Sequence, residues 1–173
     1  MDIDAFMASL AASPLAQYIS QSTYAFPTIE SLHVIAVAAV FGSISIVDLR
    51  LVGLVGNSWN IKTLTKDLLP LTWLGFVLAV ITGTLMFLSN ATGYWANVHF
   101  RLKFAALLLA GVNMLIFELV TARSMKDWEQ SDGKSLPPAV KLAGALSLLF
   151  WILVVVFGRW IGFSISAFGF PMS

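Results

Sequence analysis

Long apolar stretches alternate with short polar segments along the chain, and this alternation sets the expected architecture. A helix needs about 20 apolar residues to cross a hydrocarbon core about 30 Å thick. The segments between the apolar stretches are rich in turn-forming, aromatic or charged residues. The pattern therefore predicts transmembrane helices over residues 28–55, 69–88, 102–122 and 139–163.

Short connections between apolar helices place successive helices antiparallel, which favours an up-and-down bundle. Before the first of them, Ile3, Phe6 and Leu10 follow one another at spacings of three and four, which is typical of an amphipathic helix at a membrane interface. We predict an all-α fold, an integral membrane four-helix bundle with a short interfacial helix over residues 1–22. All of residues 1–173 then form a single membrane domain.

Composition agrees with a membrane protein. Of 173 residues, 58% are hydrophobic and 11% are charged, whereas soluble proteins carry about 25% charged residues. The net charge of +1 gives no reason to expect nucleic acid as a partner, and the expected partner is the lipid bilayer. The absence of cysteine excludes disulfides and thiolate-bound metal sites. The first residues carry two acids and no base, so we expect no secretory signal there.

Basic residues predict the orientation in the membrane. The loops after the first and third apolar stretches are rich in lysine and arginine, so both are expected on the cytoplasmic side. Both termini and the second loop then face outward. Arg101, Lys103 and Arg159 lie on the outward side against this rule, and we expect them to have a role or a partner there.

The outward layer of ionisable residues is the predicted cofactor site. Glu30 and His33 are three residues apart and share a helix face, so the carboxylate can orient the imidazole. A ring nitrogen of His33 is a candidate ligand for haem iron or copper. Arg101, Lys103 and Arg159 are candidates for neutralising a haem propionate. The alternative is that Glu30 and His33 only pair with Arg101 or Arg159 to tie helices together.

A second axial ligand stays open on the sequence alone. His99 lies in the second loop, and Met86 and Met114 lie in apolar runs where a thioether commonly just fills space. The second position on a haem iron is then one of these three side chains or none.

A second polar layer is expected on the cytoplasmic side. Asp48, Arg50, Glu118 and Arg123 are predicted to form a structural ion-pair network between the first and third helices. The alternative is a proton path, for which the interior offers several polar side chains. These are Ser43, Ser45, Thr82, Asn113 and Ser147.

Small residues recur at helical spacing on two of the apolar stretches. Gly75, Ala79 and Gly83 share one face, and Gly158 and Gly162 form a small-xxx-small pair. Such faces allow close helix contact. They are expected either to pack the bundle or to join subunits, so a homo-oligomer or a larger membrane complex stays open.

Several stretches resemble a known group of proteins. "ESLHVIAVAAVFGSISIVDLRLVGL", "NVHFRLKFAALLLAGVN" and "LFWILVVVFGRWIGF" look like a bacterial four-helix inner-membrane family without an established function. The resemblance implies a multi-pass protein of the bacterial inner membrane. Together with the charge pattern, it predicts that both termini are periplasmic.

A more remote resemblance concerns haem proteins. The spacing of His33, Gly42 and Arg50 is similar to that of HemJ-type protoporphyrinogen oxidases, and the segment also resembles the membrane part of copper-resistance protein D. Lys103 at the start of the third helix matches the HemJ pattern, whereas Asn113 stands where that family tends to place another histidine. The resemblance implies b-type haem binding through His33.

Three functions follow as hypotheses. The first is a haem b or copper electron-transfer module that serves a periplasmic partner. The second is a cofactor-free structural or assembly subunit of a membrane complex. The third is a small proton- or solute-conducting oligomer. Whether the protein is an enzyme stays uncertain, since the sequence has no recognisable nucleophile–base pair or phosphate-binding loop.

Overall fold

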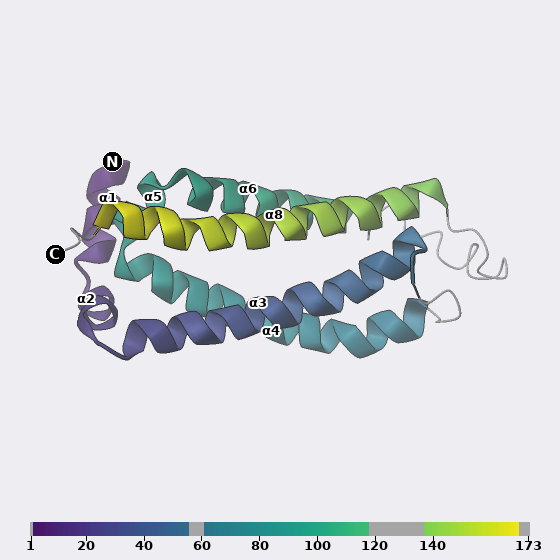
Figure 1. Cartoon of the computed structure of the whole chain (residues 1–173), viewed down its shortest axis with the longest axis horizontal. Helices are drawn as coiled ribbons and strands as arrows, with labels where there is room; N and C mark the ends of the chain where they lie inside the picture. Colours follow the sequence, from purple (N-terminus) through teal and green to yellow (C-terminus); the bar gives the residue numbers. More distant parts are fainter. Residues whose placement is uncertain (1, 56–60, 118–136, 170–173) are drawn as a thin grey trace.

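The protein is a bundle of long helices in the computed structural model, which describes residues 2–55, 61–117 and 137–169 (Figure 1). The four long helices are α3 (Ala25–Val52), α4 (Ile61–Ser89), α6 (Val98–Ile116) and α8 (Pro138–Gly169). Three short ones are α1 (Ile3–Ala11), α2 (Pro14–Gln21) and α5 (Ala91–Ala96). The described part of the chain contains no strand, and the predicted all-α membrane bundle is confirmed.

Each long helix contains a segment long and apolar enough to cross a membrane. Large apolar side chains such as Ile35, Leu74 and Leu115 are exposed on the outside of the bundle. Several buried positions carry small side chains, for example Ala36 and Ala106. Small residues at helix contacts and large apolar residues on the outside suit helices that pack against one another in lipid. The protein is a multi-pass membrane protein.

The long helices are arranged as two pairs. α3 packs along α4, α6 packs along α8, and the two pairs meet mainly through α3 and α8 (Figure 1). A Cβ atom at Gly144 of α8 would lie 3.0 Å from the Leu51 Cβ and 3.1 Å from the Asp48 carbonyl oxygen. The pairs therefore touch closely near Gly53, where α3 ends, and we call this end of the bundle the Gly53 end.

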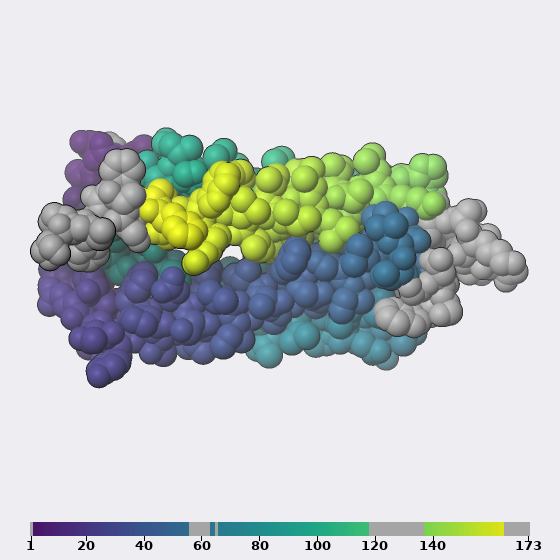
Figure 2. Space-filling model, viewed as in Figure 1, coloured from purple at the N-terminus to yellow at the C-terminus, as the bar shows by residue number. Residues whose placement is uncertain are grey.

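The opposite end, called here the α2 end, is where α1, α2 and α5 lie (Figure 1). Here α3 and α8 separate, and the surface is hollowed between them (Figure 2). This is the half of the bundle that the charge pattern predicts to face outward.

Local chemistry fixes the helix ends. α3 stops at Val52 instead of the expected residue 55 because Gly53 adopts φ 89°, a conformation that glycine tolerates, and its N–H bonds back to Leu49 and Arg50. α6 begins at Val98 instead of residue 102 because the Asn97 side chain caps it, accepting from the His99 N–H at 2.9 Å.

The N-terminal segment forms two helices instead of one continuous helix. Ser13 caps α2 and Pro14 opens it, which interrupts the chain after α1. In α1 no side chain is buried, and Ile3 and Phe6 are exposed. In α2 Ile19 is buried, and this helix packs on α4. The second helix therefore belongs to the packed bundle.

Candidate functional site

His33 lies on the inner side of α3, where it joins α3 to α4. Its Nδ1 atom is 2.9 Å from the Thr82 hydroxyl. The imidazole ring lies over Gly83, where an added Cβ would be 3.1 Å from the ring carbon Cε1. The predicted small face of α4 therefore packs within this chain, and Gly83 makes room for the ring.

Thr82 places a hydroxyl beside one ring nitrogen of His33. The Thr82 hydroxyl also bonds the carbonyl oxygen of Leu78 at 2.7 Å, as threonines in helices often do. In the tautomer that carries its proton on Nδ1, the Nδ1–H of His33 donates to Thr82 and Nε2 keeps a lone pair.

Lys103 reaches the same half of the bundle from α6. Its aliphatic chain lies against Gly158 of α8, where an added Cβ would be 3.3 Å from the ammonium nitrogen. The Lys103 charge acts electrostatically on His33. Within the three described ranges, no carboxylate pairs with Lys103. A half-buried imidazole and a half-buried ammonium group therefore lie in the half of the bundle near the α2 end.

The other predicted site residues lie at the surface of the same end. Glu30 is exposed, one turn before His33. Arg101 is exposed, and Arg159 is exposed with its guanidinium 4.8 Å from the centre of the Phe163 ring. Of the five predicted residues, His33 and Lys103 are half-buried, while Glu30, Arg101 and Arg159 are exposed.

Glu30 acts on a neighbour other than His33. Burial raises the pKa of Tyr94 on α5 to about 12, and the negative charge of Glu30 contributes to the rise. Thr82 bonds the Nδ1 atom of His33 and so has the role that the sequence analysis gave to Glu30, which is to orient the imidazole. The sequence marks Thr82 only as a polar residue of the interior, and no spacing rule connects positions 33 and 82.

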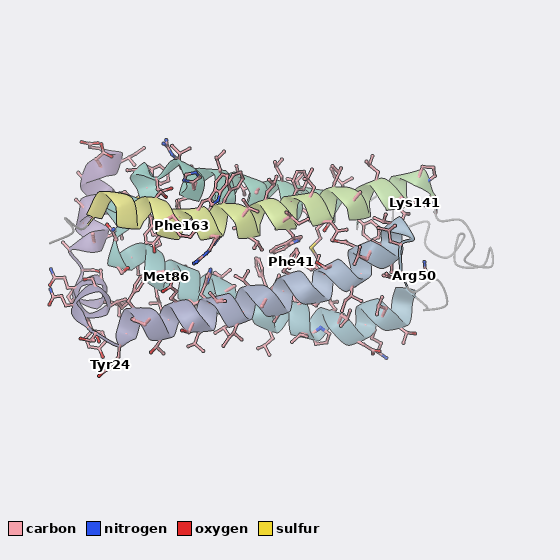
Figure 3. All side chains as sticks on the ribbon, viewed as in Figure 1. Tyr24, Phe41, Arg50, Met86, Lys141 and Phe163 are labelled. Carbon is pink, nitrogen blue, oxygen red and sulfur yellow. The ribbon has the colours of Figure 1, made fainter. Side chains whose placement is uncertain are left out.

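The candidates for a second axial ligand are separated by the fold. The His99 ring packs edge-on against Trp160, with 5.4 Å between ring centres. Met114 is 47% exposed on the outside of α6, and it is about 16 Å along the helix from Lys103. Met86 is half-buried on α4, in the half of the bundle near the α2 end (Figure 3). Met86 is the candidate that shares the depth of His33.

A second polar cluster lies at the Gly53 end. Asp48 is 5% exposed and accepts a hydrogen bond from Ser147 on α8. Arg50 is equally buried. Glu118 and Arg123, the other members of the predicted ion-pair network, lie outside the described residues. Asp48 therefore links α3 to α8 through Ser147, and the full network stays a prediction.

These features define the class of the molecule: an integral membrane bundle of four spanning helices, with an imidazole and an ammonium group enclosed near one end. The chain belongs to the family of unknown function DUF6644, whose family model matches residues 10–164. No curated protein and no solved structure matches the chain. The resemblance to HemJ-type proteins stays a prediction.

Proposed function

We propose that this protein binds a b-type haem between its two helix pairs, with His33 as an axial ligand, and transfers electrons at the outward face of the bacterial inner membrane. When bound, a haem iron supplies one-electron redox chemistry. The residues of the chain hold the group, orient its ligand and balance its charge.

The orientation of His33 is the observation that carries the proposal. Histidines that bind metals usually donate their other ring N–H to a hydrogen-bond acceptor, which fixes the tautomer and the ring plane. The Thr82 hydroxyl, 2.9 Å from Nδ1, is such an acceptor. Contact with Gly83 restricts the ring further. The Nε2 atom is thus prepared as a ligand by residues of a second helix.

Lys103 is the cation best placed for a haem propionate. A half-buried ammonium group without an acidic partner in the described residues favours an anion beside it. Gly158 leaves space for the lysine chain, and this arrangement supports a site between α6 and α8 on one side and α3 on the other. Arg101 and Arg159, which are exposed, would serve the second propionate or a partner protein at the surface.

The donor set favours haem over copper. A haem iron needs only one or two axial ligands from the protein, because the porphyrin supplies the other four. A protein copper site usually gathers several histidine, cysteine or carboxylate ligands. Among the residues that the structure describes, no three such side chains come together.

The test is a reduced-minus-oxidised absorption spectrum of the detergent-purified protein, produced with ample haem supply and measured beside a metal analysis. We expect a Soret band and visible bands of a b-type haem. His33→Ala should abolish them, and Thr82→Val should weaken haem affinity about 10- to 100-fold, as losses of such supporting hydrogen bonds do.

Thr72→Val is the matched control. Thr72 bonds Ser43 across the same pair of helices at 2.7 Å, away from His33. Its loss should leave the spectrum unchanged. A wild-type protein that shows no Soret band, even after incubation with haem in detergent, would contradict the proposal.

A structural or assembly subunit without cofactor is the second candidate. The bond between Ser43 and Thr72 favours it, because the link between His33 and Thr82 is then only another hydrogen bond between α3 and α4. This function predicts a colourless protein that co-purifies with a membrane partner. His33→Ala should leave that association intact.

A further inference from the structure

The Gly53 end contains a carboxyl group in an unusual position. Asp48 lies inside the α3 span, and 95% of its surface is covered, since it is 5% exposed. Ser147 donates a hydrogen bond to this carboxyl group. Its other oxygen, Oδ2, is buried and has no hydrogen-bond partner among the residues described.

A second buried oxygen lies on the same face of α3. Ser45 precedes Asp48 by three residues, a spacing that brings side chains on a helix about 5–6 Å apart. The Ser45 hydroxyl is also buried without a hydrogen-bond partner in the described part of the chain. Ser43, in contrast, donates to its own helix and bonds Thr72. The two oxygens without partners are therefore about one turn apart on α3.

The charged groups around Asp48 do not neutralise it by direct pairing in the described residues. On its own helix Arg50 is buried and is already engaged in an interaction. On the other helices Lys66 and Lys141 are exposed, and α6 carries no charged side chain from residue 104 to 117. Burying a carboxylate without full compensation costs free energy, and taking up a proton removes that cost.

We propose that Asp48, together with Ser147 and Ser45, forms a proton-binding site inside the membrane near the Gly53 end. A proton from the aqueous phase at that end adds to Oδ2 of the carboxylate, while the hydrogen bond from Ser147 stays on the other oxygen. Release returns the proton to the same phase, and no electron is transferred. The Ser45 hydroxyl, one turn earlier, offers the next group to which the protonated carboxyl can donate.

This site is independent of the proposed haem. Thr82 and His33 lie near the α2 end, and the 15 residues from His33 to Asp48 span about 22 Å of helix. Ionisable residues inside a membrane are rare and commonly take part in proton relays. A proton-binding carboxyl group at this depth suits a protein that couples its work to proton movement.

The test is infrared difference spectroscopy of the whole protein in lipid, recorded across a pH titration in H₂O and D₂O. We expect a carboxylic acid C=O band that changes with pH and shifts in D₂O. Labelling aspartate with ¹³C at the side-chain carboxyl should shift the same band, which assigns it to an aspartate without any substitution.

Variants then assign the residue. Asp48→Asn should abolish the band, and Ser147→Ala should move its frequency because a hydrogen bond to the carboxyl group is lost. Asp67→Asn is the matched control, since Asp67 is an exposed aspartate at the same end of the bundle. If Asp48→Asn fails to fold, the frequency shift of the C=O band in Ser147→Ala still tests whether the band belongs to Asp48. Identical spectra for wild type, Ser147→Ala and Asp48→Asn, or a band that disappears only in Asp67→Asn, would overturn the proposal.

Discussion

The two helix pairs use glycine in different ways. Between α3 and α4, a Cβ at Gly75 would lie 3.0 Å from the Val40 side chain and 3.2 Å from the Ala36 carbonyl oxygen. Between α6 and α8, the three heavy atoms nearest to a Cβ at Gly158 all belong to the side chain of Lys103. Glycine thus brings backbones together at Gly75 of one pair and admits a charged side chain at Gly158 of the other.

Polar bonds also differ between the pairs. In the α3–α4 pair side chains bond each other, Ser43 with Thr72 and His33 with Thr82. In the α6–α8 pair a side chain bonds the backbone, since Asn113 donates to the Ala143 carbonyl oxygen at 3.0 Å. The α3–α4 pair is therefore linked by side chains that substitution can remove from either helix.

The largest expected effect is on the close contact of α3 and α4. Gly75→Ala should destabilise the bundle by about 2 kcal/mol, because the new methyl group meets backbone that has little freedom to move. The apparent unfolding temperature in detergent is the measurement. Gly42→Ala is the control, since nothing lies within 4 Å of a Cβ at that position. Equal stability of the two variants would contradict the close contact.

Gly158→Ala should destabilise the bundle less than Gly75→Ala, by about 1 kcal/mol at most, because the flexible end of Lys103 can move away. A double-mutant cycle sharpens the expectation. In the Lys103→Ala background, Gly158→Ala should become nearly neutral, since the side chain that it meets is gone. Additive effects of the two substitutions would show that Lys103 does not occupy the space left by Gly158.

Loss of a single link between α3 and α4 should be smaller still. Thr72→Val removes the bond with Ser43 and should cost about 0.6 kcal/mol, the average for hydrogen bonds between membrane helices. Thr84→Val is the control, because the Thr84 hydroxyl bonds only the Val80 carbonyl oxygen of its own helix. Unfolding measurements that fail to separate these variants would argue against the link.

The smallest effect on stability at neutral pH is expected from a substitution in the aromatic cluster that connects the two helix pairs at the α2 end. Tyr94 of α5 packs on Phe87 of α4 and on Phe100 of α6. Its pKa rises from 10.0 to about 12, so the unfolded chain loses this proton before the folded one does. Stability from the buried phenol is complete below pH 10 and is lost as pH rises toward 12.

Tyr94→Phe should therefore remove part of the alkaline loss of stability and change little at pH 7. Unfolding followed from pH 8 to 12 measures the difference between wild type and variant. Tyr18→Phe is the control, because Tyr18 is 68% exposed. Parallel pH curves for wild type and Tyr94→Phe would contradict burial of the phenol.

Hydropathy was readable from the sequence, whereas the ends of α3 and α6 were not. Apolar stretches long enough to span a bilayer predict the four long helices, and the small face of α4 predicts close packing. The helix α5 was not predicted from its aromatic loop. The fold shows it, with Asn90 as its N-cap and Tyr94 packed beside the stacked rings of Phe87 and Phe100.

The candidate site was only partly readable. His33 and Lys103 stand out as ionisable groups in apolar surroundings, and that signal depends on composition alone. The hydrogen bond from His33 to Thr82, the space that Gly158 leaves for Lys103 and the link from Asp48 to Ser147 join residues far apart in the chain.

The sequence by itself determined that this chain crosses a membrane with helices, because hydrophobic length and the need to satisfy backbone polar groups are local properties. The tertiary structure decided which side chains share an environment. Helix rotation and crossing place Thr82 beside His33 and bring Tyr94 near Glu30. These neighbours depend on packing between segments that are far apart in the sequence and that no local pattern relates.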